Sequence, residues 1–511
     1  MSMTPRLASM TFVCLLASVA CNGTGQVLTT IPDSGAASSD AACTGPTCCA
    51  TNAECIERNG GAPTICRRDH RCAALLSPEC QRLFADANDV ANDAVVVVGH
   101  VAPPDANGDV HGDAIALARK QIHDAAGGLD PATPGGLRRP FVVVSCSTEG
   151  PSAIAAAHHL ADDVEVPAVV ASGSSETVAA MAEQVLVAKH VFSITPTATA
   201  ARISKIVDDD LVWRLAASEL VSVQVLGPLV GGYLEPRARS QGLVTSGTLR
   251  VAVVYDGAAA AAELALIQST LRFNGKSVAE NIGDFLAVEI GANAAATIAS
   301  FAPHLVIHVV PPADPGASIA AIETAWSASS SRPYHVATRD GSTKALESAT
   351  ASDAALRARC FPLGALPVDW STNDIAAFDI GLRTAFPELA AVPISESAGD
   401  AYDALYLVGD AIVAAGAGPL DGTGVASGMH RFAVPGTTIH FGAADAAAAM
   451  MALAGGANLD FHGVRGRMLF DDAGDRRHHA IAFCSQSGSF APSGLRVDAI
   501  TGTVQGAATC D

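Results

Sequence analysis

The sequence predicts an α/β protein whose parallel sheets are covered by helices on both faces, preceded by a small cysteine-rich module and an export segment. Short runs of β-branched residues alternate with alanine-rich stretches, which is typical of βαβ units. Most of these runs are apolar at every position, as in strands buried on both faces. The chain has 511 residues, more than one ordinary core holds, so we expect two or three compact units.

The N-terminus is typical of an exported protein. One positive charge, Arg6, precedes an apolar stretch that ends in small residues at Ala20, which predicts a signal peptide over residues 1–20. The next residue is Cys21, and residues 18–21 resemble the lipobox of bacterial lipoproteins, whose cysteine is acylated. Cleavage after Ala20 by a general signal peptidase is the alternative, since Ser18 stands where leucine is usual.

Residues 21–42 are rich in small polar residues and are expected to form a lipidated, flexible tether. A cysteine-rich module follows over residues 43–82. Its cysteines include no C-x-x-C pair and only one neighbouring histidine, so disulfides are favoured over a zinc site, and six of them could form three bridges. The seven cysteines of the module are Cys43, Cys48, Cys49, Cys55, Cys66, Cys72 and Cys80.

The predicted strands begin at residue 94 and recur along the chain with helical stretches between them. Near the end, residues 467–470 and 480–483 flank a turn-forming segment and predict a closing hairpin. The apolar runs that predict buried strands are residues 94–99, 141–146, 166–171, 250–256, 304–310 and 334–338.

Composition excludes several classes of function. The formal net charge is -20, so we expect no nucleic-acid partner. No apolar run long enough to span a membrane follows the N-terminus. Motifs for a nucleophile elbow, a phosphate loop or a zinc protease are missing from the sequence, so we expect neither an enzyme nor a cofactor. Adjacent histidines at 158–159 and 478–479 point apart, so no metal site is predicted there.

Several blocks, in order, resemble the leucine/isoleucine/valine-binding family of type I periplasmic binding proteins. Together they span residues 94 to about 487. The matching blocks are the strand 95–99, the glycine and serine loop 171–175, the segment 191–199, Trp213 to Ala216, the strand 250–256, Ala401 to Ala404, and 461–475.

This resemblance implies two doubly wound lobes joined by a three-strand hinge, with the ligand between them at the carboxyl ends of the strands. It places the crossings near Ala217, Cys360 and Arg467. The first lobe is then expected over residues 94–217 plus 361–466, the second over 218–360 plus 467–490, and a C-terminal tail over 491–511.

The candidate site follows from the same blocks. Ser174 and Ser175 precede a predicted helix whose free N–H groups favour an anion, so they are the candidate carboxylate clamp, although a serine there could merely cap the helix. Thr197 and Thr199 match family positions that contact both ends of the ligand. An ordinary polar loop is the alternative.

An ammonium group would need an acid in the same site. Asp340 follows a predicted strand where the family places such a carboxylate, and Glu219 is the second candidate. The sequence departs from the family at two aromatic positions, which read Pro311 and Pro312 in one lobe and Asn107 and Gly108 in the other. Cys146 also lacks the family's disulfide partner, since that position is Ser174.

The resemblance implies a monomeric, cell-envelope lipoprotein that captures an amino acid or similar small polar solute for an ABC importer. Its partners would be that solute, an ABC permease, and the membrane through the lipid anchor. A ligand-sensing or interaction lipoprotein that uses the same cleft without transport is the alternative. A third possibility is a degenerate member whose missing aromatics abolished binding.

Overall fold

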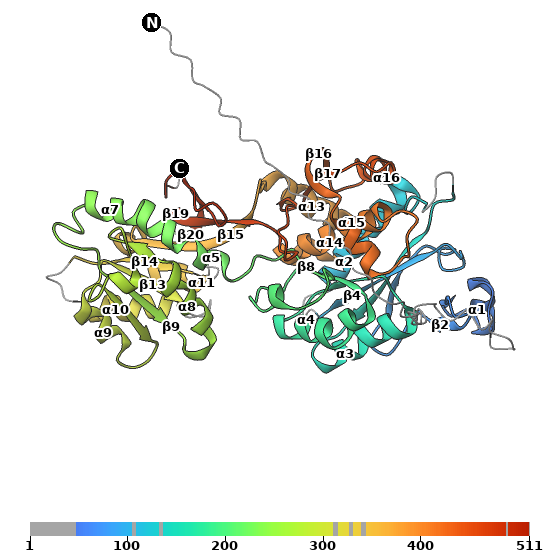
Figure 1. The fold of residues 1–511 in the computed structure, drawn as a ribbon, viewed down its shortest axis with the longest axis horizontal. Coiled ribbons are helices and arrows are strands. Elements are labelled where there is room, and N and C mark those ends of the chain that lie inside the picture. Colours follow the sequence, from blue (N-terminus) through green and yellow to red (C-terminus); the bar gives the residue numbers. More distant parts are fainter. Residues whose placement is uncertain are drawn as a thin grey trace, which may run out of the picture. The chain divides into compact units, whose positions relative to one another are not determined.

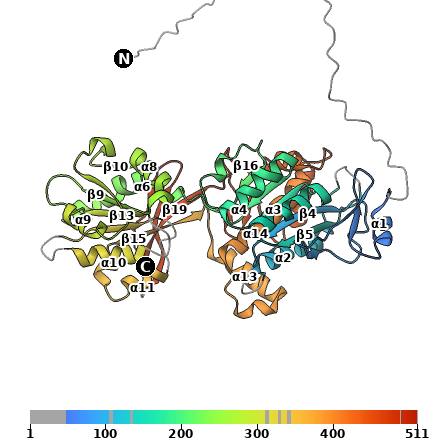
Figure 2. The same cartoon turned by 90° about the horizontal axis from the view of Figure 1, so that it is seen from below.

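The computed structural model describes residues 48–104, 109–131, 136–309, 315–326, 331–338, 344–486 and 489–509. The signal segment, the tether and Cys21 lie outside these residues, as does Asp340. Figures 1 and 2 show two large sheets, each layered between helices.

The cysteine-rich module consists of one short helix and a two-stranded hairpin: α1 (Asn52–Arg58), β1 (Thr64–Cys66) and β2 (Cys72–Ala74). Cys49–Cys66 and Cys55–Cys72 are disulfides between described residues of the module, and Cys48 is disulfide-bonded as well. The first joins the segment before α1 to β1, and the second joins α1 to β2. A unit this small buries too little apolar surface for the hydrophobic effect alone to keep it folded, so disulfides provide part of its stability.

Another disulfide, Cys80–Cys146, joins the module to the first sheet. Beside it, β3 (Arg82–Phe84) pairs antiparallel with β5 (Phe141–Ser147). The buried Leu75 of the module packs in the same apolar cluster as strands of that sheet. The prediction of disulfides is therefore confirmed for the module, but the bridge from Cys80 reaches outside it. Cys146, which has no family-type partner at Ser174, is bonded to Cys80 instead.

The first sheet has six strands in the order β3-β5-β4-β6-β7-β8, and all neighbours except β3 and β5 run parallel. Alternate residues of β4 and β5 enter two separate apolar clusters, one on each face. The continuous apolar runs in the sequence arise from this double burial. The remaining strands are β4 (Val96–Ala102), β6 (Ala168–Ala171), β7 (Phe192–Thr195) and β8 (Val212–Arg214).

Helices cover both faces of this sheet (Figure 1). On one face α2 (Val110–Ala126) packs against α14 (Glu396–Ala414), with α13 (Thr372–Ala385), α15 (Gly422–Met429) and α16 (Ala446–Ala454) around them. The other face carries α3 (Pro151–His158) and α4 (Ser175–Met181). A small sheet of β16 (Phe432–His440), β17 (Leu459–Gly463) and β18 (Gly466–Arg467) follows α15 in the chain.

The second sheet has eight strands in the order β12-β9-β13-β14-β15-β19-β20-β21. It is parallel from β12 to β15 and antiparallel from β15 onward. The strands are β9 (Val251–Tyr255), β12 (Phe285–Glu289), β13 (Leu305–Val309), β14 (Tyr334–Ala337), β15 (Cys360–Pro367), β19 (His478–Gln486), β20 (Ser489–Asp498) and β21 (Val504–Gln505).

Figure 2 shows α6 and α8 on one side of this sheet and α10 and α11 on the other. The helices of the second lobe are α5 (Val221–Gln224), α6 (Leu226–Leu229), α7 (Glu235–Ser240), α8 (Ala261–Thr270), α9 (Ala294–Phe301), α10 (Pro315–Ala325), α11 (Lys344–Thr350) and α12 (Ala354–Arg357). A short hairpin joins β10 (Arg272–Phe273) to β11 (Lys276–Ser277). Among the described residues, no helix has both the length and the apolar character needed to cross a bilayer.

Three expectations about the C-terminal part are wrong. Residues 361–367, expected in the first lobe, belong to β15, which pairs with β14 in the second sheet. Arg467, expected in the second lobe, forms an ion pair with Asp460 of β17, next to the first sheet. The predicted hairpin is wrong in its extent: an antiparallel bridge between Phe470 and Arg476 closes the turn, but residues 480–483 belong to β19, which pairs with β15 and β20. Residues 491–511 are not a tail, since they contain most of β20 and all of β21, which pair within the second sheet.

Candidate functional site

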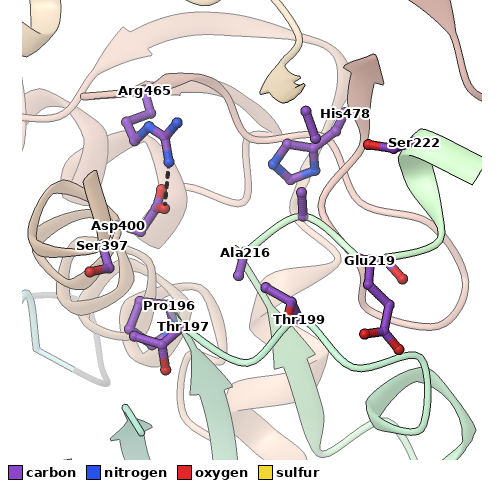
Figure 3. A pocket seen from close by; sticks show the side chains of 13 residues that line it. Pro196, Thr197, Thr199, Ala216, Glu219, Ser222, Ser397, Asp400, Arg465 and His478 are labelled. Atoms are coloured by element: carbon purple, nitrogen blue, oxygen red, sulfur yellow. Dashed lines mark hydrogen bonds and ion pairs between the residues drawn. The ribbon is translucent and has the colours of Figure 1, made fainter. Parts of the chain in front are cut away.

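A cavity of about 540 Å³ lies where the loops after β7 and β8 meet β15 and β19 (Figure 3). The loops follow the carboxyl ends of parallel strands, where α/β folds commonly bind ligands. Its lining is polar on several sides and comes from segments far apart in the chain. The lining residues are Pro196, Thr197, Thr199, Ala216, Ala217, Ser218, Glu219, Ser222, Ala365, Ser397, Asp400, Arg465 and His478.

The two serines proposed as a carboxylate clamp stand behind this lining and make contacts within the protein. Ser174 caps α4, because its hydroxyl accepts a hydrogen bond of 3.2 Å from the Thr177 N–H. The Ser175 hydroxyl accepts from the N–H groups of Thr199 and Ala200, each at 3.1 Å. Ser175 therefore fixes the loop after β7, which forms one wall of the cavity, whereas Ser174 caps its own helix.

Thr197 and Thr199 do line the cavity, as the sequence led us to expect of ligand-contacting residues. The hydroxyl of Thr197 is engaged twice with Gly173, since it donates to that residue's carbonyl and accepts from its N–H, both at 2.8 Å. This hydroxyl locks the loop after β7 to the loop after β6. The position of Thr199 depends on the hydrogen bond to Ser175 described above.

Glu219 also lines the cavity, but its carboxylate is directed away from the centre (Figure 3). One of its oxygens accepts a hydrogen bond of 3.0 Å from the Ala201 N–H. Asp340, the other candidate acid, lies outside the described residues, as do Asn107, Gly108, Pro311 and Pro312.

An ionic cluster that the sequence did not predict forms the opposite wall. Asp400, on the first turns of α14, is buried and accepts from two guanidinium groups at 3.2 Å each, those of Arg465 and Arg476. Arg476 also donates to the carbonyls of Arg467 and Gly466, so the protein holds it on several sides. Arg465 is the member of the pair whose side chain lines the cavity.

Arg465 stands in the turn between β17 and β18, which requires a glycine next to it. Gly466 has a φ of +108°, and a Cβ atom there would lie 2.6 Å from the Val368 carbonyl oxygen. The glycine thus allows the turn to approach the backbone after β15, and Arg467 donates its N–H to the same carbonyl at 2.8 Å.

His478, the first residue of β19, supplies an imidazole to the cavity. Its Nδ1 lies 2.8 Å from the Arg476 carbonyl oxygen. Burial lowers the pKa of this ring well below its usual value, and the positive charge of Arg476 acts in the same direction. The ring is therefore neutral near pH 7.

A second buried acid lies one turn further along α14. Burial raises the pKa of Asp403 to about 7, an effect that Arg476 partly offsets. One carboxylate oxygen accepts from the Val464 N–H at 2.9 Å, and the other has no hydrogen-bond partner within the described parts of the chain. Asp403 therefore changes protonation near neutral pH beside the turn that carries Arg465.

Arg214, at the end of β8, fixes the loop next to the cavity. Its guanidinium is fully buried and contacts both carboxylate oxygens of Asp475, at 2.9 and 2.6 Å. It also donates to the Ala200 carbonyl and to the Ser204 hydroxyl, at 2.9 and 2.7 Å. Asp475, in the segment that the sequence predicts to form a turn, is thus part of a buried network.

Neither metal-like cluster among the described residues supports a metal site. The thiols of Cys49, Cys55 and Cys66 are consumed by disulfides. Asp86, Asp89 and His123 lie close together, but both carboxylates already form ion pairs with the guanidinium of Arg119.

The two sheets, their helices and the cavity at the strand ends define the fold of type I periplasmic binding proteins. The structure resembles the branched-chain amino acid transporter substrate-binding protein LivJ from Streptococcus pneumoniae in complex with isoleucine, with a TM-score of 0.50 and 18% sequence identity over 78% of this chain and 98% of that one.

Two further solved structures show the same fold. An ABC transporter substrate-binding protein from Desulfitobacterium hafniense in complex with Leu matches with a TM-score of 0.51 at 15% identity, over 78% of this chain and 99% of the other. A putative branched-chain amino acid ABC transporter from Silicibacter pomeroyi matches with a TM-score of 0.53 at 15% identity, over 78% and 96%. No family model and no curated protein matches the sequence.

Proposed function

We propose that this protein is an exported substrate-binding protein that captures an amino acid or similar small polar solute and delivers it to an ABC importer. The observation that carries the proposal is the cavity of about 540 Å³ at the strand ends, whose wall contains buried ionic groups. A cavity of this size suits a small molecule, and its few fixed polar groups would orient it.

The named functions of proteins with the same fold support this proposal, since they are substrate-binding proteins of transporters. We infer no enzymatic activity. The apolar N-terminal segment ending at Cys21 supports export and acylation at that cysteine, and a lipid anchor would keep the protein next to its permease. Ser175, Thr197, Thr199 and Asp340 remain candidate ligand contacts.

Thermal-shift screening of the full chain, expressed with its own export signal, tests the proposal. A panel of amino acids and small anions should contain at least one compound that raises the melting temperature, since a ligand at a hundred times its Kd adds about 2.7 kcal/mol of stability. The proposal is wrong if no compound in a broad panel of small polar solutes gives a shift.

A cavity-filling variant tests where a hit binds. Ala216→Trp places an indole at a residue that lines the cavity and should abolish the shift. Ala385→Trp places the same group at an exposed position near the end of α13 and should leave the shift unchanged. A shift that survives Ala216→Trp would place the ligand elsewhere.

A further inference from the structure

A second cavity, of about 190 Å³, lies within the first lobe and shares no lining residue with the cavity at the strand ends. Its walls come from α2, α13, α14 and the ends of β16 and β17. The imidazoles of His440 and His462 line it, together with the carboxylate of Asp374 and the amide of Gln121. The cavity therefore contains polar groups that the proposed function does not use.

The two histidines of this cavity are cross-strand neighbours. His440 and His462 stand opposite each other in the register of β16 and β17, which run parallel and side by side (Figure 1). Their ring centres lie 5.3 Å apart. Within the parts of the chain that the structure describes, neither ring forms a hydrogen bond, since the contact of His462 Nε2 with Asp460 Oδ1 is 3.9 Å long. Both rings therefore keep a nitrogen lone pair free for a ligand.

The separation of the rings fits two imidazoles that bind one metal ion. In tetrahedral zinc sites each Zn–N bond is about 2.0–2.1 Å long, which places the centres of two coordinating rings roughly 5 Å apart. Imidazole nitrogen suits Zn²⁺, Cu²⁺ and Ni²⁺, whereas Mg²⁺ and Ca²⁺ prefer oxygen ligands. Water would complete the coordination, and a cavity of about 190 Å³ has room for several waters of about 30 Å³ each.

The charges beside the two rings favour a cation. Asp460, two residues before His462 on β17, accepts from the guanidinium of Arg467 at 2.7 and 2.6 Å. Asp369 lies 3.7 Å from the same guanidinium, so two carboxylates share one positive charge. Asp374 adds a third carboxylate on the cavity wall, and it has no ion pair with any described residue. The negative charge that remains would attract a metal ion to the cavity.

We propose that His440 and His462 form a binding site for a divalent transition-metal ion such as Zn²⁺. This site does not depend on the solute-binding function proposed above. The ion would link β16 and β17, whose connection along the chain runs through α16. Gly463 and Val464 follow His462 and line the same cavity, and Arg465, the next residue, lines the larger one. A bound ion would thus stabilise the turn that carries Arg465.

Isothermal titration of the full chain with Zn²⁺ tests the proposal, on protein made without a polyhistidine tag and treated with EDTA beforehand. His440→Gln and His462→Gln should each weaken Zn²⁺ binding by at least about tenfold, since loss of a partner that merely orients a metal ligand already costs that much. His440 is exposed, so its replacement should leave the fold intact. The matched control is His158→Gln, which replaces an exposed histidine beside the carboxylate of Asp162 and should not change Zn²⁺ binding.

Thermal unfolding gives an independent readout. Zn²⁺ should raise the melting temperature of the parent chain and of His158→Gln, and should raise it less in the two cavity variants. Mg²⁺ should not displace Zn²⁺, because it prefers oxygen ligands. The proposal is overturned if the chain binds no Zn²⁺, if neither cavity substitution weakens Zn²⁺ binding, or if Mg²⁺ competes on equal terms. None of these results would contradict solute binding at the larger cavity.

Discussion

Asp475→Ala would remove the carboxylate from the fully buried guanidinium of Arg214. Loss of one partner from a buried ion pair typically costs about 3–5 kcal/mol, since the other charge stays buried. Two features reduce that cost here. The Asp475 side chain is 16% exposed, so water can reach the vacated position, and Arg214 keeps its contacts with Ala200 and Ser204. We therefore expect a loss of about 2–3 kcal/mol in the free energy of unfolding.

Urea unfolding followed by tryptophan fluorescence measures this loss. Trp213 precedes Arg214 in β8, and its ring lies 4.8 Å from that of Phe470, so its emission reports on this part of the first lobe. Asp475→Asn keeps one acceptor oxygen and should lose less. Asp472→Ala, at an exposed position of the same turn, is the matched control and should lose under about 0.5 kcal/mol.

The same substitution should also weaken ligand binding, because it removes the hydrogen bond of 2.6 Å that the Ser204 hydroxyl donates to Asp475, in the loop that adjoins the cavity residue Thr199. The reasoning is refuted if Asp475→Ala unfolds at the same urea concentration as Asp472→Ala. In that case the buried network would not stabilise the lobe, and the loop would be held by its other contacts.

Three further predictions concern the bridge, the buried acid and the anchor. Replacing both Cys80 and Cys146 by alanine should lower the free energy of unfolding by about 2–4 kcal/mol, measured by urea unfolding against Cys360→Ala, which removes a free buried thiol; equal losses would contradict a role for the bridge. Asp403→Asn should stabilise the protein at pH 8 and change little near pH 5, because a carboxyl with a folded pKa of about 7, above its unfolded value, loses stability as pH rises through 7; equal effects at both pH values, measured by thermal unfolding, would contradict this. Mass spectrometry of the mature protein should find an acylated Cys21 at its N-terminus, and an unmodified amine there would exclude the lipoprotein hypothesis but not export.

The sequence predicts the buried parallel strands well because each is apolar on both faces. The run 250–256 contains β9, and the run 304–310 contains β13. The sequence does not predict β15 and its antiparallel neighbours. β15 contains two prolines and a glycine, which a pattern of propensities assigns to a loop, whereas pairing with β14 and β19 keeps it extended.

Some residues of the candidate site could likewise be predicted from the sequence, and others could not. Thr197, Thr199 and Glu219 could be predicted because they follow strands in blocks with a family resemblance, and they do line the cavity. The sequence alone could not predict Asp400, Arg465 and His478 as cavity residues. Each is a single polar residue on a different element, and only the tertiary fold brings α14, the turn after β17 and the start of β19 together.

The bond between Cys80 and Cys146 determines how a mechanical load would pass through the molecule. A pull on the chain from its N-terminal side reaches Cys80 and there divides between the backbone and the disulfide. The covalent branch leads directly to β5, inside the first sheet, and bypasses the intervening β4 and α2. Tension would thus be borne by a covalent bond rather than by the three-residue ladder between β3 and β5, which could otherwise open from its end.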